Sequence, residues 1–313
     1  MKGLELSERY YRAFGAEMIR REAPEWEDRI AVGLTGSGSE CYGYDDDVSG
    51  DHDFEPGFCV FLPEEDELDR KTAFRLERAY AKLPAEFEGA ARQKLAPTGG
   101  QRRGIFRRKA FFRERIGCLP SEMTAEDWLR LPEWALAEAV NGKIFRDDAG
   151  EMIREREILR HMPEDPRRKR LAGHLLMMAQ SGQYNYRRCL QHGETGAAQL
   201  SAVEFAQHTM SAVFLLRERY KPYYKWSFRA LRELPGGEDT ARSLEWLLTT
   251  DNGGEIAGDK AFCMEGIAAD VIAQLQDQGL TQAACGDLEK HAYSVNDGIR
   301  GAEIRNLSVM YCV

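Results

Sequence analysis

The sequence lacks long apolar runs and paired cysteine motifs. No stretch of about eighteen apolar residues occurs, so no transmembrane helix is expected. The amino-terminal residues lack the apolar core of a signal peptide, so we expect a cytoplasmic protein without a membrane partner. Seven cysteines occur without any C-x-x-C pair, which favours reduced thiols over a disulfide framework or a zinc site.

An excess of positive charge is also absent. The chain carries 43 Lys and Arg against 52 Asp and Glu, a formal net charge of −9. Such a balance offers no global attraction for nucleic acid, so no long nucleic-acid partner is expected. Basic residues do gather over 102–109 and 167–170. Such runs are more commonly part of a solvated face, but they could also bind a triphosphate. The histidines at 161, 174, 192, 208 and 291 show no spacing typical of metal ligands.

Hydrophobic periodicity predicts two domains. The first half alternates helical and strand patterns, and the second half is dominated by helical ones. We therefore expect a mixed α/β or α+β domain over residues 1–146 and an all-α helical bundle over 147–313. The expected helices cover residues 7–22 (with Ser7 as the N-cap), 66–82, 123–130, 132–141 and about 203–220, and the expected strands cover 30–35, 58–62 and about 104–106.

The most informative stretch joins the first two expected strands. It begins with Gly38-Ser39 and ends, after eleven intervening residues, with Asp51-His52-Asp53. Alternate residues of a strand share a face, so Asp51 and Asp53 would point the same way and could bind Mg²⁺ or Mn²⁺. The turn at Gly38 and Ser39 offers backbone N–H groups to phosphates. On their own, two such aspartates would more simply be turn residues.

The polar residues near this stretch are expected to have structural roles rather than to bind a ligand. We expect Asp45, Asp46 and Asp47 to be solvated loop acids, because three crowded carboxylates would repel one another around a shared site. His52 should point to the opposite strand face. Glu40 directly follows the turn, and we expect it to stabilise a helix N-terminus rather than face the site.

The pattern resembles the signature of the nucleotidyltransferase superfamily built on the DNA polymerase β catalytic core. The strings at 39–41, 51–54, 111–113, 141–145 and 220–226 further resemble an uncharacterised bacterial branch, a domain-of-unknown-function family with a C-terminal helical domain. The resemblance covers most of residues 30–230. It implies a small mixed-sheet nucleotidyltransferase-like domain over 1–146 and a helical acceptor-binding or lid domain over 147–313.

The same resemblance implies site residues and ligands. Asp51 and Asp53 would be catalytic metal ligands, and ATP or another nucleoside triphosphate would bind at Gly38 and Ser39. The segment Tyr223-Tyr224-Lys225-Trp226 could stack on a base and meet a phosphate, or could equally be a bundle helix with its aromatics in the core. The resemblance favours Lys225 as a nucleotide-binding residue.

One part of the family pattern is missing. Nucleotidyltransferases normally carry a third carboxylate on a later strand, but the strand expected at Gly104-Ile105-Phe106 has no acid. Glu86 and Glu88 lie upstream of it, and Glu114 follows on an expected helix. Two functions therefore stay open. One is transfer of a nucleoside monophosphate to a hydroxyl of a small molecule, a protein or an RNA end. The other is a catalytically degenerate nucleotide sensor or interaction module, which includes a toxin–antitoxin role.

Overall fold

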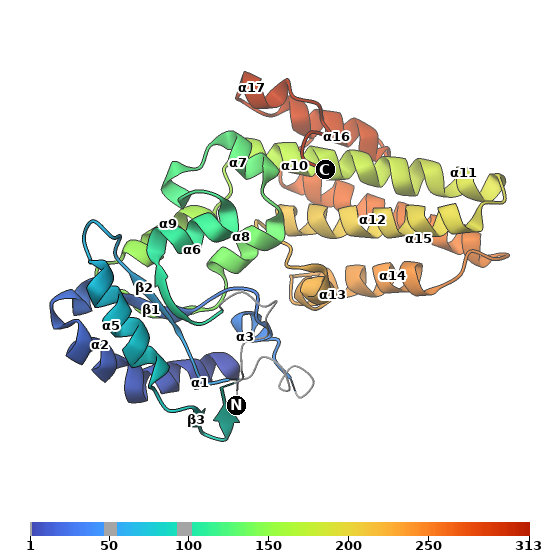
Figure 1. The fold of residues 1–313 in the computed structure, drawn as a ribbon. Coiled ribbons are helices and arrows are strands. Elements are labelled where there is room, and N and C mark those ends of the chain that lie inside the picture. Colours follow the sequence, from blue (N-terminus) through green and yellow to red (C-terminus); the bar gives the residue numbers. More distant parts are fainter. Residues whose placement is uncertain (1, 47–54, 93–101) are drawn as a thin grey trace. The chain divides into compact units, whose positions relative to one another are not determined.

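The structure is a computed structural model that describes residues 2–46, 55–92 and 102–313. The chain divides into two compact units, each with its own core (Figure 1). The first unit holds Met1–Met123 and Ala135–Arg160, and the second holds Thr124–Trp134 and His161–Val313. The chain therefore passes from one unit to the other after residues 123, 134 and 160.

The first unit combines helices with a small mixed sheet. In chain order, its elements are α1 (Gly3–Tyr10), η1 (Tyr11–Gly15), α2 (Ala16–Glu22), η2 (Pro24–Arg29), β1 (Ala31–Leu34), α3 (Ser39–Tyr42), β2 (Cys59–Leu62), α5 (Arg70–Ala81), β3 (Glu86–Phe87), β4 (Ala90–Ala91), β5 (Gly104–Arg107), α6 (Arg108–Ile116), η3 (Pro120–Glu122), most of α8 (Glu133–Val140), β6 (Lys143–Arg146) and α9 (Glu151–Arg160).

The larger sheet of the described residues has the strand order β5-β2-β1-β6. β1 runs antiparallel to both β2 and β6, whereas β2 and β5 run parallel. Every residue of β1 and β2 is buried, as expected for short continuous apolar runs. The predicted combination of helices with a small sheet is confirmed. β6 was not expected, because its sequence, Lys143-Ile144-Phe145-Arg146, carries charges at both ends.

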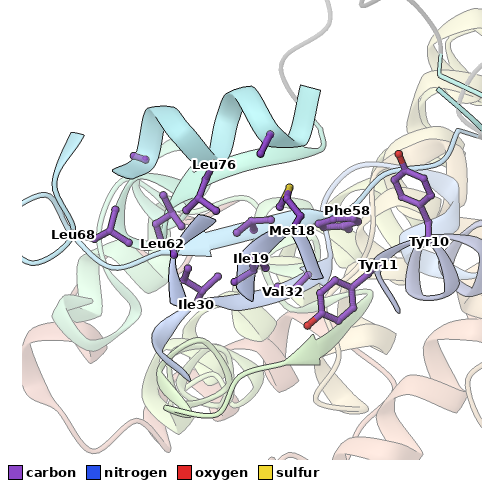
Figure 2. Packing of buried hydrophobic residues seen from close by; sticks show 14 residues of the cluster. Tyr10, Tyr11, Met18, Ile19, Ile30, Val32, Phe58, Leu62, Leu68 and Leu76 are labelled. Atoms are coloured by element: carbon purple, nitrogen blue, oxygen red, sulfur yellow. The ribbon is translucent and has the colours of Figure 1, made fainter. Parts of the chain in front are cut away.

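The main core of the first unit lies where α1, α2 and α5 pack on the sheet. Figure 2 shows Leu76 of α5, Leu62 of β2 and Met18 of α2 among the fully or nearly fully buried side chains of this cluster. Burial of such side chains contributes roughly 1.5–3 kcal/mol each. The start of α5 is fixed by Asp69, whose Oδ1 accepts from the backbone N of Thr72 at 2.7 Å.

The first helix differs from the prediction. It begins at Gly3, so Ser7 is not an N-cap but a fully buried residue inside α1. The hydroxyl of Ser7 donates to the carbonyl oxygen of Gly57 at 2.7 Å, a long-range bond that sequence periodicity does not reveal. The helix then widens into a π-helical turn, η1, where Gly15 lets the ring of Phe58 approach. A Cβ built on Gly15 would lie 2.4 Å from that ring.

The second unit is helical throughout. Its elements are α7 (Ala125–Arg130), the first residues of α8, α10 (Glu164–Met178), η4 (Ala179–Asn185), α11 (Tyr186–Gln191), α12 (Thr195–Leu216), α13 (Tyr224–Arg232), α14 (Gly237–Thr249), α15 (Ile256–Asp277), α16 (Leu288–Asp297) and α17 (Ala302–Arg305). α10 packs against both α12 and α16 (Figure 1). The helix expected over 203–220 is α12, which starts earlier and ends at Leu216.

Two fully buried lysines link helices of the second unit. Lys169 of α10 donates to Oδ1 of Asn296 at 2.8 Å and to the carbonyl oxygens of Arg305 and Leu307 at 3.2 and 2.6 Å. Lys260 of α15 donates to Oε1 of Gln199 and Oδ1 of Asn252, both at 2.8 Å, and to the carbonyl oxygen of Thr250 at 3.0 Å. Each ammonium group therefore has an oxygen partner for each of its three protons.

The compact units are bounded differently from the predicted domains. α9, placed after the expected boundary at 146/147, belongs to the first unit, where Glu155 accepts from the backbone N and the hydroxyl of Ser121 at 3.0 and 3.1 Å. Residues 124–134 belong to the second unit, because Arg170 of α10 donates to carbonyl oxygens of that segment. Across residues 2–46, 55–92 and 102–313, no helix has the length and apolar character that crossing a membrane requires.

Candidate functional site

Four chain segments meet at one edge of the sheet, which we call the turn edge. It consists of Thr35–Ser39, Glu55–Phe58, Arg102–Arg103 and Asn141–Gly142. The strand register places them together, since Gly33 pairs with Cys59, Cys59 with Gly104, and Leu34 with Lys143. The exit of β1 and the entries of β2, β5 and β6 therefore lie side by side. This arrangement brings the predicted Gly38-Ser39 turn next to the chain that enters β2.

The turn after β1 is fixed by Asn141. Its Nδ2 donates to the carbonyl oxygen of Gly36 at 2.7 Å, and its Oδ1 accepts from the backbone N of Gly36 at 2.9 Å. The hydroxyl of Thr35 lies 3.0 Å from the carbonyl oxygen of Glu138. Gly142 (φ +65°) passes so close that a Cβ there would lie 2.0 Å from the carbonyl oxygen of Leu34. These contacts hold the turn in one conformation.

Gly38 and Ser39, predicted as nucleotide-binding residues, are both buried at the turn edge. Ser39 is only 3% exposed, and within the described residues its hydroxyl oxygen has no hydrogen-bond partner. A buried hydroxyl without a partner costs free energy, and such groups in folded proteins commonly have a water, an ion or a ligand as the missing partner.

Glu40 lies in the first turn of α3, the position expected for a carboxylate that stabilises a helix N-terminus. Its carboxylate folds back over Gly38, where a Cβ would lie 2.3 Å from the two carboxylate oxygens. Oε1 of Glu40 accepts from Nη2 of Arg103 at 2.8 Å, and Nη1 of Arg103 donates to Oε1 of Glu55 at 2.9 Å. Burial opposes the charge of Arg103, but the two carboxylates outweigh it, and the pKa of Arg103 is raised. The carboxylate of Glu40 therefore lies at the N-terminal end of α3 and is also paired with a buried guanidinium.

Asp45 is not a solvated loop acid, which corrects the prediction. It is 7% exposed, and its Oδ2 accepts from the backbone N of Gly3 at 2.7 Å. The carboxylate therefore ties the start of α1 to the loop after α3, where a negative charge also stabilises the N-terminal end of the helix. Asp46 is exposed, in line with the expectation for it. Asp47 lies outside the described residues.

Arg115, which the sequence patterns did not indicate, also reaches the turn. It lies in the last turn of α6, and a Cβ built on Gly36 would be 3.4 Å from its Nη2. Its guanidinium carbon lies 3.7 Å from the centroid of the Phe111 ring, and Nη1 donates to the carbonyl oxygen of Phe111 at 3.2 Å. Burial lowers the pKa of Arg115. Its spacing of four residues from Phe111 on a helix is the local signal for this contact.

The predicted metal ligands Asp51 and Asp53, and His52 between them, lie outside the described residues. Among the residues that are described, no group of three or more histidine, cysteine or acidic side chains is arranged to hold a metal ion. The third expected strand is β5, and as the sequence indicated it has no acid along Gly104–Arg107. Glu114 lies on α6 and is exposed. Glu86 and Glu88, which precede β5, are also exposed.

Lys225, the remaining predicted nucleotide-binding residue, belongs to the second unit. It is exposed at the start of α13, with its Nζ 4.9 Å from the ring centroid of Trp226. The alternative interpretation placed the neighbouring aromatics in the core, which is wrong for Tyr223 and Tyr224, since they are 46% and 76% exposed. Their ring centroids are 4.4 Å apart, and Trp134 lies 6.3 Å from Tyr223. These side chains form an exposed aromatic surface beside Lys225.

The second unit also contains a buried polar cluster. Nδ1 of His174 and Nδ1 of His208 are 2.8 Å apart, so one of them carries the proton and the other accepts it. Burial lowers the pKa of His174 well below its usual range and, with Lys221, that of His208 to about 4. Glu133 faces His174, with Oε1 3.8 Å from Nε2. Sequence spacing gave no indication of this pair, because the two histidines come from separate helices.

A depression of about 570 Å³ in the second unit lies along η4 and the start of α16. Its wall includes Gln183, whose Nε2 donates to Oε2 of Glu265 and to the carbonyl oxygen of Gly286, both at 2.8 Å. None of the predicted site residues lines it. The depression therefore adds nothing to the site at the turn edge.

Residues 128–227 match the model of a family described as a domain of unknown function (DUF4037). The matched segment includes Lys225, His174 and His208 but does not reach Gly38, Ser39, Asp51 or Asp53. No curated protein and no solved structure matches the chain. The segment is thus similar to a family whose description names no activity.

Proposed function

We propose that the protein is a nucleotidyltransferase-like protein that binds a nucleoside triphosphate, ATP or another, at the turn edge. Asp51 and Asp53 hold Mg²⁺ or Mn²⁺, and the phosphates lie against Gly38 and Ser39. The observation that carries this proposal is the convergence of the turn with the chain entering β2. Glu55, only two residues after Asp53, is held at the turn edge by Arg103, 2.9 Å away.

Two features of the described residues support a ligand at this edge. The buried hydroxyl of Ser39 has no hydrogen-bond partner within the described chain, and the turn is held rigidly by Asn141. Two carboxylates plus substrate phosphates are a donor set that suits Mg²⁺. When bound, the metal would supply charge stabilisation for the phosphates and the leaving group.

The proposed reaction is transfer of a nucleoside monophosphate. An acceptor hydroxyl releases its proton to solvent, and its oxygen forms a bond to the α-phosphorus. The bond from that phosphorus to the β-phosphate bridging oxygen breaks, and pyrophosphate leaves with the electron pair. The second unit, with its exposed aromatic surface beside Lys225, is proposed to recognise the acceptor: a small molecule, a protein side chain or an RNA end.

A second candidate is nucleotide binding without transfer. The acid-free strand β5 favours it, because a site with only two carboxylates lacks the group that would help to activate the acceptor. In that case the protein is a sensor or an interaction module, as in a toxin–antitoxin pair. Both candidates require nucleotide binding through Asp51 and Asp53.

The test measures binding and transfer separately. The protein is incubated with Mg²⁺ and each α-labelled nucleoside triphosphate, with and without cell extract, and pyrophosphate release and labelled products are measured. We expect the double variant D51N/D53N to lose transfer by about a hundredfold or more, because the metal contributes several kcal/mol. Asp66→Asn, which removes an exposed carboxylate of the same unit, should change neither binding nor transfer.

The outcomes separate the two candidates. Metal-dependent nucleotide binding without any labelled product or pyrophosphate, across all nucleotides and both metals, would leave the sensor. If D51N/D53N binds nucleotide in Mg²⁺ as tightly as the natural protein does, the metal assignment is wrong and both candidates fall.

A further inference from the structure

Arg103 at the turn edge and Arg115 beside the turn differ in how their charges are compensated. Arg103 donates to Glu40 and Glu55 and is thereby neutralised. Arg115 has no carboxylate within ion-pair distance in the part of the chain that the structure describes, and its hydrogen bond there goes to the carbonyl oxygen of Phe111. A guanidinium has five N–H donors. Most of the donors of Arg115 are therefore available to another partner.

The available N–H donors of Arg115 lie next to Gly36. Nη2 of Arg115 lies next to the turn, so close that a Cβ on Gly36 would be in contact with it at 3.4 Å. Gly36 has φ +133°, a conformation that favours glycine, and thus leaves the space in front of the guanidinium open. Ser39, whose buried hydroxyl lacks a partner within the described residues, belongs to the same turn.

The charge pattern favours an anion as the missing partner. Burial without a carboxylate leaves the positive charge of Arg115 undercompensated, and the lowered pKa of Arg115 has this cause, although Glu114 and Glu138 act on it from longer range. The carboxylates of Glu40 and Glu55 are both paired with Arg103. A planar guanidinium binds phosphate oxygens through two parallel N–H bonds, and a serine hydroxyl can donate a third.

We propose that Arg115 is a phosphate-binding residue, which with the hydroxyl of Ser39 and the turn Gly36–Ser39 receives a phosphate group of the nucleotide. The proposal rests on the proposed function for the identity of the ligand. In this proposal the guanidinium of Arg115 binds the phosphate directly, and no metal ion is needed for that contact. The same group would hold the pyrophosphate product when that occupies the site.

A structural role for Arg115 is the alternative. The guanidinium stacks on Phe111 and lies at the C-terminal end of α6, where positive charge is stabilising. The two roles differ in what a substitution does to stability. A structural arginine lost to methionine lowers the melting temperature. An undercompensated buried charge replaced by an apolar side chain of similar length leaves it unchanged or raises it.

The experiment titrates the full-length protein with inorganic pyrophosphate in EDTA by calorimetry and records thermal unfolding of each variant. We expect R115M to weaken pyrophosphate binding by about tenfold or more, the loss of a charge-assisted bond, without a fall in melting temperature. R115K keeps the positive charge but loses the two parallel N–H donors of the guanidinium. Its affinity for pyrophosphate should therefore lie between that of R115M and that of the natural protein. R113M removes the same charge from an exposed position of the same helix and should bind like the natural protein.

Equal pyrophosphate affinity of R115M and the natural protein would overturn the proposal, and so would an equal loss in R113M, which would show a general charge effect. If R115M does not fold, R115K decides: unchanged affinity in a folded R115K overturns the two-pronged contact. D51N/D53N should bind pyrophosphate in EDTA normally. Arg115-dependent binding without any metal-dependent transfer would leave this inference standing while the proposed function fails.

Discussion

Each unit contains buried positive charge, and Arg115 of the first unit differs from Lys169 and Lys260 of the second in how many of its donors are used. In the second unit, Lys169 and Lys260 are fully buried, and each reaches three oxygens of side chains and backbone. In the first unit, Arg115 is partly buried, and within the described residues its hydrogen bond goes to one carbonyl oxygen. The two lysines, whose ammonium protons all have oxygen partners, hold helices together. Arg115, beside a turn with an unpartnered hydroxyl, is suited to a ligand.

Buried cations with a structural role and those with a ligand-binding role differ in how many of their hydrogen-bond donors are used within the protein. A buried cation whose donors are all used stabilises the fold and loses that contribution when it is removed. A buried cation with unused donors costs stability in the free protein and regains it with a ligand. Apolar substitution of Lys260 and of Arg115 should therefore affect stability differently.

The largest expected effect is at Lys260. Lys260→Met would remove the donor of the Thr250 carbonyl oxygen and one of the two donors of each side-chain oxygen, Gln199 Oε1 and Asn252 Oδ1. We expect a loss of about 3–5 kcal/mol in the free energy of unfolding, measured by urea denaturation. R115M, by contrast, should show no loss in the free energy of unfolding.

Lys290→Met is the matched control, since Lys290 is exposed on α16. Its effect should stay within about 0.5 kcal/mol. A loss at Lys260 no greater than that at Lys290 would contradict the structural role of Lys260.

The next effect is a pH dependence of the second unit. His174 and His208 are neutral in the folded protein because burial, together with Arg170 and Lys221 at His174 and with Lys221 at His208, lowers their pKa, that of His208 to about 4. Between about pH 4 and the ordinary value of about 6.5, the unfolded chain binds protons that the folded chain does not. Stability is therefore fully present above about pH 6.5 and falls as pH drops towards 4, by about 3 kcal/mol for His208.

Urea denaturation at a series of pH values measures this slope. His208→Gln should flatten it between pH 4 and 6.5, whereas His192→Gln, at an exposed position, should leave it unchanged. A slope that is the same in all three proteins would show that the buried pair does not titrate in this range.

The smallest effects concern two buried serines. Ser201 donates to the carbonyl oxygen of Ser181 at 2.9 Å in the second unit, so Ser201→Ala should cost about 1 kcal/mol of stability. Ser39 has no partner within the described chain, so Ser39→Ala should change stability by less than about 0.5 kcal/mol while weakening pyrophosphate binding. Equal losses of stability at the two positions would remove the distinction between the units.

Local patterns in the sequence predicted much of the fold. β1 and β2 are continuous apolar runs, and α12 has its apolar residues at helical spacing, so each was predicted from neighbours along the chain. β6 was missed because it is stabilised by pairing with β1 rather than by its own composition. Ser7 was misassigned for the same reason, since its partner Gly57 is distant in sequence.

The site was predictable to a similar extent. The Gly38-Ser39 turn follows a strand and has a local signature, and the structure places it at an edge where β2, β5 and β6 begin. The ion pairs of Glu40 and Glu55 with Arg103, and the approach of Arg115 to Gly36, join segments far apart in the chain. No spacing rule within one sequence indicates such contacts. They follow from the sheet topology.

The clamp of Asn141 on Gly36 has a consequence for the order of folding. The two residues are 105 positions apart, and the neighbouring strand β6 pairs with β1, the strand that leads into the turn. Contacts of such sequence separation form slowly, because a long loop must close first. During synthesis, β1 and α3 leave the ribosome long before Asn141 does. The turn is therefore among the last parts of the first unit to reach its final conformation, and a chain cut before residue 141 would lack its clamp.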